Sequence, residues 1–325
     1  DYSCVPVWFM RQAGRYLPEF QKIRSQNTDF IKLCLNSDLS SEITLQPLKR
    51  FHLDAAIIFS DILMVPYALG QTVIFEKNKG PILSEFNLDI FLSNNKIDFI
   101  KKLNPVYEAI KKTKLSLNKD KSLISFVGAP WTLAIYMLGL KKNKTELDLV
   151  KLKQKESDLI IVIDKLNEYL CIHLENQIKA GADTVQIFDS WAGLIPSEKL
   201  SDFCFIPNKK VVEFCKRNKI PTICFPKGIN KNYVNFANTV KPDCLNLDYA
   251  IDPMWAKVNL QNHCLQGGMN PNMLFREENE IFNEIDKYLT IFKGSPYIFN
   301  LGHGLLPETN PLVLEKVINR VNNFK

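Results

Sequence analysis

The sequence predicts an α/β fold in which eight parallel strands alternate with helices and close into a single (β/α)8 TIM barrel. Short apolar runs typical of buried parallel strands recur between segments with helical periodicity. No Gly-x-Gly-x-x-Gly follows any of these runs, and no Walker loop is present. Eight strands over 325 residues therefore fit a barrel better than an open Rossmann sheet. We expect residues 1–325 to form one domain.

Each expected strand is a run of four or five mainly apolar residues, and the eight runs are 7–10, 55–59, 124–128, 184–188, 222–225, 244–247, 264–267 and 297–301. Two expected helices stand out between them. Residues 157–180 carry a leucine and isoleucine stripe and are followed by Gly181, which is a common stop signal. Residues 276–292 carry a second stripe before Gly294.

Residues 72–84 depart from this alternation. Val73-Ile74-Phe75 and Pro81-Ile82-Leu83 flank a Lys-Asn-Lys-Gly turn. Two short apolar runs around such a turn are typical of a β-hairpin. We therefore expect a hairpin inserted after the second strand.

Composition limits the classes of function. The chain is 46% hydrophobic, and no apolar run is long enough to span a bilayer. The net charge is +6, which favours a polyanionic substrate. The basic run Lys141-Lys142-Asn143-Lys144 has no interleaved aromatic residues, so we interpret it as a solvated loop and expect no nucleic-acid partner. Eight scattered cysteines without a Cys-x-x-Cys pair indicate buried reduced thiols.

The most informative segment is Pro6-Val7-Trp8-Phe9-Met10-Arg11-Gln12-Ala13-Gly14-Arg15-Tyr16-Leu17-Pro18-Glu19. A strand-like run ends in two arginines separated by Gln-Ala-Gly. Gly14 and Pro18 disfavour a helix here, so the arginines are expected on a loop. Guanidinium groups on such a loop can bind carboxylates or phosphates bidentately, although a structural ion pair is the alternative.

Polar residues follow the other expected strands, where the active site of a barrel lies. The set is Arg11, Asp61, Ala129-Pro130-Trp131, Asp189-Ser190-Trp191, Lys227, Asp248-Tyr249, Asn270 and His303. Each has an ordinary alternative role. Asp61 and Ser190 could cap the next turn, and His303 could be a surface histidine. Tyr136, in the expected helix after the third strand, is by helical spacing more typical of the core.

Two long motifs carry a family resemblance. Residues 6–19 resemble the N-terminal signature of uroporphyrinogen decarboxylases, and Phe126-Val127-Gly128-Ala129-Pro130-Trp131-Thr132-Leu133 resembles their second signature. Similar segments continue to Gly302-His303-Gly304-Leu305. The segment Phe188-Asp189-Ser190-Trp191-Ala192-Gly193 is similar to the bacterial and plastid form.

The resemblance implies removal of the four acetate carboxylates of uroporphyrinogen III, giving coproporphyrinogen III in haem biosynthesis without metal or organic cofactor. It implies that Asp61 lies beneath the macrocycle and that Arg11 and Arg15 bind side-arm carboxylates, with Arg11 also the candidate proton donor. The backbone amides of Gln12, Ala13 and Gly14 would add donors. Tyr136, Ser190 and His303 would complete the polar ring. A homodimer is expected as well.

Two alternatives remain open. Related corrinoid or thiol methyltransferases share the barrel but hold zinc, whose ligand positions here correspond to Thr222-Ile223-Cys224 and His303, a poor zinc set. A non-catalytic tetrapyrrole-binding protein is the other. The chain begins at Asp1, so we expect any targeting segment to be missing. Its Lys, Asn and Ile content indicates an A/T-biased genome, and we expect the protein in a plastid or apicoplast-like stroma or in the cytoplasm.

Overall fold

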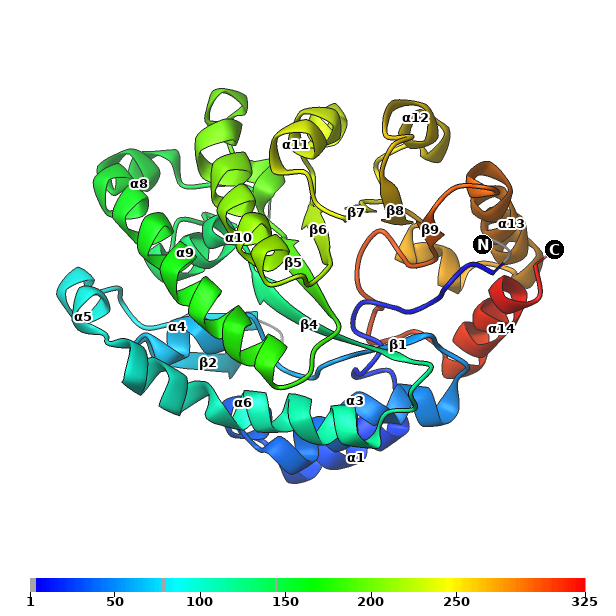
Figure 1. Ribbon diagram of the computed structural model, residues 1–325, viewed down its shortest axis with the longest axis horizontal. Helices are drawn as coiled ribbons and strands as arrows, with labels where there is room; N and C mark the ends of the chain where they lie inside the picture. Colours follow the sequence, from blue (N-terminus) through cyan, green and yellow to red (C-terminus); the bar gives the residue numbers. More distant parts are fainter. Residues whose placement is uncertain (1–3, 77–79, 144, 325) are drawn as a thin grey trace.

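The computed structural model describes residues 4–76, 80–143 and 145–324. Its centre is a curled parallel sheet of seven strands, surrounded by helices (Figure 1). In spatial order the strands are β1 (Ala55–Ile57), β4 (Ser122–Gly128), β5 (Thr184–Asp189), β6 (Thr222–Pro226), β7 (Cys244–Leu247), β8 (Cys264–Gly267) and β9 (Tyr297–Ile298). Consecutive strands pair in register throughout, for example Cys244 with Cys264. The parallel α/β sheet predicted from the apolar runs is confirmed.

The first expected strand, residues 7–10, does not form as a strand. Within it, Val7 alone makes a parallel bridge, to Phe299 just beyond β9. On the other side, the Asp54 amide donates to the Val7 carbonyl at 2.9 Å, and the Val7 amide donates to the Asp54 carboxylate at 2.8 Å. The segment therefore lies between β9 and β1 without a regular ladder.

Side chains explain the missing ladder. The Phe9 amide donates to Gln12 Oε1 at 3.0 Å, and the Met10 amide donates to Asn300 Oδ1 at 3.2 Å. These backbone donors are thus satisfied by side chains in place of the backbone carbonyls of a neighbouring strand. The first predicted strand, residues 7–10, is therefore replaced by an irregular segment that side chains hold in place.

The inside of the sheet is filled. On β6, Ile223 and Phe225 belong to an interior cluster with Trp8 and Met10, whereas Cys224 packs in the outer layer against the helices. A polar layer crosses the interior, where Trp8 Nε1 donates to Gln266 Oε1 at 2.8 Å and Gln266 Nε2 donates to Asn246 Oδ1 at 2.6 Å. A ligand must therefore bind at the open end of the strands, because the interior has no room for it.

The expected helices 157–180 and 276–292 are confirmed as α9 (Glu156–Lys179) and α13 (Glu278–Phe292). The other outer helices are α3 (Ser37–Arg50), α6 (Lys96–Ser116), α10 (Ile206–Arg217), α11 (Tyr233–Val240), α12 (Pro253–Asn259) and α14 (Pro311–Asn322). Shorter helices are α1 (Pro18–Gln26), α2 (Phe30–Cys34), α4 (Met64–Ala68), α5 (Leu88–Ser93), α7 (Pro130–Leu138) and α8 (Leu149–Gln154). Single turns are η1 (Ala192–Leu194), η2 (Ser197–Lys199), η3 (Ser201–Phe205), η4 (Asn230–Asn232) and η5 (Pro271–Phe275).

A separate antiparallel pair, β2 (Val73–Glu76) and β3 (Gly80–Leu83), lies between β1 and β4 in the chain, where the hairpin is expected. Val73 pairs with Leu83 and Phe75 with Pro81. The ring of Phe75 lies 4.4 Å from that of Phe30, which joins the pair to α2. The expected turn residues 77–79 lie outside the described part of the chain.

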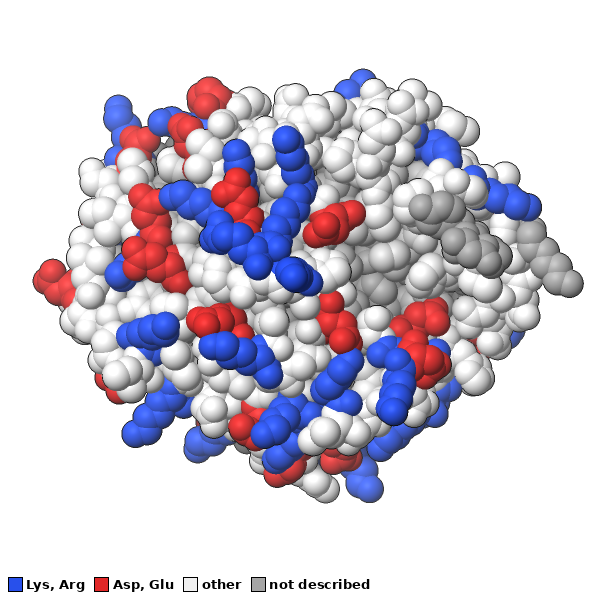
Figure 2. Space-filling model, in the orientation of Figure 1, with Lys and Arg blue, Asp and Glu red and all other residues white. Residues whose placement is uncertain are grey.

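The surface carries charges of both signs. Figure 2 shows basic and acidic side chains interleaved over the face seen in Figure 1. Ion pairs between residues far apart in the sequence include Lys114–Asp183 and Lys210–Asp164. In the described residues, no helix has the length and apolar character needed to cross a membrane. Five of the cysteines are buried thiols, as expected: Cys34, Cys204, Cys215, Cys224 and Cys244.

Candidate active site

The arginine loop begins in a strained conformation. Arg11 has φ 62°, in the left-handed region that non-glycine residues rarely adopt. The loop then passes so close to itself that a Cβ on Gly14 would lie 2.8 Å from the Arg11 carbonyl oxygen. Glycine is therefore required at position 14 by the turn that presents the Arg11 side chain.

The structure corrects the expected role of Gln12. Its amide already donates to the Phe9 carbonyl at 3.1 Å, and its side chain is fully buried. The side-chain Nε2 donates to the Ala55 carbonyl at 2.9 Å, which ties the loop to β1. Gln12 thus supports the loop and has no backbone donor left for a ligand. The amides of Ala13 and Gly14, in contrast, donate to no other group in the described part of the chain.

Asp61 follows β1, and the structure shows one of the two roles that its sequence position allows, that of a hydrogen-bond acceptor in the next turn. Its Oδ1 accepts a 2.8 Å hydrogen bond from the Leu63 amide and so orders the turn before α4. Burial raises the pKa of this carboxyl to about 6, although the Leu63 amide and the Arg11 guanidinium act in the opposite direction. The carboxylate is therefore a partly buried anion close to Arg11.

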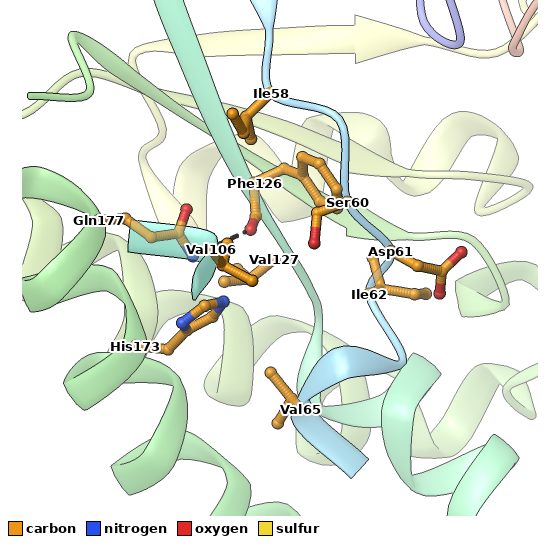
Figure 3. A pocket seen from close by; sticks show the side chains of 10 residues that line it. All are labelled: Ile58, Ser60, Asp61, Ile62, Val65, Val106, Phe126, Val127, His173 and Gln177. Carbon is orange, nitrogen blue, oxygen red and sulfur yellow. Dashed lines mark hydrogen bonds between the residues drawn. The ribbon is translucent and has the colours of Figure 1, made fainter. Parts of the chain in front are cut away.

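A small cavity lies behind Asp61, lined also by Val106 of α6 and by His173 and Gln177 of α9. Its volume is about 10 Å³, room for roughly one water molecule. Figure 3 shows the Asp61 carboxylate pointing away from His173 and Gln177. The cavity is therefore not the substrate site. The Asp61 carboxylate thus faces away from this cavity.

Arg11 is crowded although it keeps solvent-exposed surface. A Cβ on Gly304 would lie 2.5 Å from Arg11 Cδ, so the guanidinium stem runs directly over this glycine. Burial and the neighbouring Arg15 lower the pKa of Arg11, while Asp61 and Tyr136 raise it. Four of the expected site residues therefore lie close together: Arg11, Arg15, Asp61 and Tyr136.

Tyr136 of α7 faces the same mouth. Burial is the main cause of its raised phenol pKa, and Asp61 raises it further while Arg11 lowers it. Its ring meets that of Trp191 edge to face at 6.1 Å. Tyr136 packs against the hydrophobic core, as helical spacing predicts, and its hydroxyl also lies close enough to Asp61 and Arg11 for both charges to act on its pKa.

Residues 126–133, the second signature, fix the loop after β5 through hydrogen bonds. Thr132 Oγ1 donates to Asp189 Oδ1 at 2.7 Å, and Trp131 Nε1 donates to the Trp191 carbonyl at 2.9 Å. The Trp191 amide donates back to Thr132 Oγ1 at 3.2 Å. Asp189 is thus a buried support, whereas Ser190 and Trp191 are half-buried at the mouth.

The ring of His303 lies 6.4 Å from that of Phe225. Burial, Arg11 and Lys227 lower its pKa to about 3, so the imidazole is neutral at pH 7. Burial and Arg11 also lower the pKa of Lys227, while Asp248 raises it. His303 is therefore a neutral hydrogen-bond donor and acceptor near two cations, Arg11 and Lys227.

Sequence reasoning assigned no role to two cations near the site. Lys227 directly follows β6 and was among the polar residues expected at the strand ends, but it was given no specific role. Lys141 was interpreted as part of a solvated loop, yet its Nζ lies 3.6 Å from the centroid of the Trp191 ring. No local signal could have revealed this contact, because Trp191 comes from a different loop.

The zinc alternative fits the geometry poorly. Cys224 packs on the helix side of β6, whereas Phe225, which contacts His303, faces the interior. The thiol and the imidazole therefore lie on opposite sides of one strand. Across residues 4–76, 80–143 and 145–324, no three His, Cys, Asp or Glu side chains are grouped so that they could hold a metal ion.

Comparison with solved structures supports the fold. A methyltransferase from Methanosarcina mazei matches with a TM-score of 0.79 at 17% identity, over 100% of this chain and 95% of that one. A B12-independent methionine synthase from Shewanella sp. W3-18-1 matches with a TM-score of 0.57 at 9% identity, over 88% of this chain and 85% of that one. At these identities the likeness concerns the fold alone.

Sequence relatives are much closer. A protein of Orientia tsutsugamushi is 41% identical over 98% of this chain and 94% of its own length, and one of Rickettsia bellii is 40% identical over 98% and 95%. A protein of Jannaschia sp. is 39% identical over 94% and 91%. All three are named uroporphyrinogen decarboxylase. The family model for uroporphyrinogen decarboxylase (URO-D) matches residues 1–324, and the chain therefore belongs to the uroporphyrinogen decarboxylase family.

Proposed function

We propose that this protein removes the four acetate carboxylates of uroporphyrinogen III and yields coproporphyrinogen III, a step of tetrapyrrole biosynthesis. The observation that carries the proposal is the partly buried Asp61 carboxylate beside Arg11 at the open end of the sheet, in a chain of this family. The relatives of Orientia tsutsugamushi and Rickettsia bellii, similar over nearly the full length, support the same activity.

The substrate supplies its own electron sink. A proton adds to a pyrrole carbon next to an acetate arm, and the ring becomes cationic. The bond to the carboxylate then breaks, its electron pair flows into the ring, and carbon dioxide leaves. A proton adds to the exocyclic carbon and the ring proton is lost, so that each acetate becomes a methyl group. The protein has to hold the ring, supply protons and stabilise the positive charge.

In this proposal Asp61 accepts hydrogen bonds from the pyrrole N–H groups and stabilises the ring cation. An ionised carboxylate accepts hydrogen bonds and donates none, and its negative charge stabilises the positive charge of the ring. Its pKa of about 6 leaves it mostly ionised at pH 7 to 8. Oδ1 is already bonded to the Leu63 amide, which fixes the direction of the group.

Arg11 and Arg15 bind side-arm carboxylates, together with the amides of Ala13 and Gly14. Tyr136, Ser190 and His303 complete the polar ring. Arg11 is the candidate proton donor, and burial shifts its pKa in the direction that favours proton release. His303, with a pKa of about 3, is neutral at pH 7 and does not act as a cationic acid.

Several finer features belong to the same proposal. Residues 7–10 close the seven strands into an eight-stranded barrel, supported by the contacts of Val7 with Phe299 and Asp54. The chain forms one domain, β2 and β3 form a hairpin insertion, and the protein is a homodimer. The choice between plastid and cytoplasm and the expected lack of a nucleic-acid partner stay predictions; the relatives described above are bacterial and lend no support to a plastid.

The test is anaerobic incubation of the purified protein with uroporphyrinogen III, with products separated by chromatography after oxidation. Coproporphyrinogen and four equivalents of carbon dioxide support the proposal. Binding without turnover supports a carrier. Stoichiometric zinc in the purified protein, with no decarboxylation, supports the methyltransferase alternative.

A further inference from the structure

Lys141 lies against two aromatic rings at the mouth of the sheet. Its Nζ is 3.6 Å from the centroid of the Trp191 ring and 5.2 Å from that of Tyr136. An ammonium at these distances from ring faces makes a cation–π contact. Interpretation of the whole basic run as a solvated loop is therefore wrong for Lys141, and Lys144 of that run lies outside the described residues.

The backbone fixes this position. Leu140 is fully buried, and its carbonyl accepts a 2.9 Å hydrogen bond from the Asp148 amide. Lys141 itself pairs in an antiparallel bridge with Leu147. Lys142 is the first exposed residue beyond this bridge, and its Nζ lies 4.0 Å from the Glu146 carboxylate. The two neighbouring lysines thus have different environments: one at the aromatic pair, the other in solvent beside an acid.

The aromatic pair belongs to the active site. Tyr136 lies close enough to Asp61 and Arg11 for both charges to act on its hydroxyl. Trp191 follows Ser190, and its carbonyl is held by Trp131. The pair stands at the ends of β4 and β5, whereas Arg11 and Arg15 come from the loop after residues 7–10. Lys141 therefore adds a cation to a part of the rim that the arginine loop does not supply.

We propose that Lys141 binds a side-arm carboxylate of the substrate, with Trp191 and Tyr136 as the platform that aims its ammonium; this rests on the function proposed above. The substrate is a disc with acetate and propionate arms all round it, so cations on more than one side of the mouth are needed to hold it. The faces of the two rings hold the ammonium at this part of the mouth. Lys141 is thus a specificity determinant for a polycarboxylate ligand.

The test compares Lys141→Met with the matched control Lys142→Met, which removes the same charge one residue away. We expect Lys141→Met to raise KM for uroporphyrinogen about 3- to 10-fold, because one partly exposed charged contact is lost. Its kcat should stay within about 2-fold of the wild-type value. Lys142→Met should leave KM within about 2-fold. Lys141→Arg, which keeps the cation and its stacking, should restore most of the affinity. Equal KM values for the two methionine variants overturn the proposal.

A second measurement separates this inference from the proposed function. Oxidised uroporphyrin is titrated into each variant at low ionic strength and its binding followed by quenching of tryptophan fluorescence. Wild-type protein that binds uroporphyrin without turning over uroporphyrinogen contradicts the proposed activity alone. If the Lys141→Met variant binds uroporphyrin as tightly as the Lys142→Met variant does, the proposed role of Lys141 is contradicted, whatever turnover the wild-type protein shows.

Discussion

Replacement of Asp61 by asparagine is expected to stabilise the protein and to remove most of its activity. Asparagine keeps an oxygen that can accept from the Leu63 amide, so the turn before α4 remains ordered. It carries no charge, so the energy required to bury a carboxylate disappears. It also lacks the negative charge that the ring cation needs. Stability and turnover should therefore change in opposite directions.

The magnitude follows from the pKa of Asp61, which burial raises from 3.8 to about 6. At about 1.36 kcal/mol for each tenfold change in acid strength, this corresponds to about 3 kcal/mol against folding above pH 6. Asp61 is partly exposed, and solvent screening reduces the figure to about 1–2 kcal/mol. The carboxyl is ionised in both states above pH 6. Below about pH 4 it is protonated in both, and the difference vanishes.

Urea unfolding at pH 8 and pH 5 measures the change. We expect Asp61→Asn to gain about 1–2 kcal/mol at pH 8 and about half of that at pH 5. Asp189→Asn is the contrast, because Asp189 also has a pKa raised to about 6 by burial, yet both its oxygens accept hydrogen bonds. Its variant should lose about 1–3 kcal/mol through unsatisfied groups.

Activity is measured in the same buffers under anaerobic conditions. Loss of a preformed electrostatic partner typically lowers kcat about 100- to 1000-fold, and we expect this for Asp61→Asn. Wild-type kcat/KM should fall below pH 6 and reach about a tenth of its plateau at pH 5, because only the ionised form is active. A variant that is less stable at pH 8, or that keeps a tenth of the wild-type activity, refutes the reasoning.

Three further changes probe the same mouth. Gly304→Ala places a methyl group against the Arg11 stem and should lower kcat/KM about 10- to 100-fold with little change in melting temperature; an unchanged kcat/KM would mean that Arg11 moves freely. Gln12→Leu leaves two buried backbone groups unpaired and should lower the free energy of unfolding by about 2–4 kcal/mol, read from denaturant titration. His303→Gln should leave the acid limb near pH 6 unmoved, since His303 itself titrates near 3; a shifted limb would reassign it from Asp61 to His303.

Most of the sheet could be predicted because each buried parallel strand corresponds to a short apolar run in the sequence. Residues 244–247 and 264–267 form β7 and β8 with the predicted bounds. The run at 7–10 looks equally strand-like, yet Gln12 and the distant Asn300 take its amides. The local sequence pattern cannot reveal that a side chain will take these backbone amides, because Asn300 comes close to Met10 only when the chain folds.

Candidate site residues could be found from the ends of strands, since parallel strands bring their carboxyl ends to one edge. Asp61 and His303 were found in this way, and the former proves to be both a turn acceptor and a neighbour of Arg11. The family resemblance implied backbone donors at Gln12, Ala13 and Gly14, whereas the tight turn already uses the Gln12 amide in a hydrogen bond to the Phe9 carbonyl.

The amino-acid sequence by itself determined the alternation of strands and helices, the loop with two arginines and the family. These depend on hydrophobic runs, turn residues and the order of motifs, all of which are local. Only the tertiary structure decided that Cys224 faces the helices, that Asp61 is buried enough to resist ionisation, and that Lys141 rests on Trp191. Burial and contact between distant segments set these properties, and neither exists until the chain has folded.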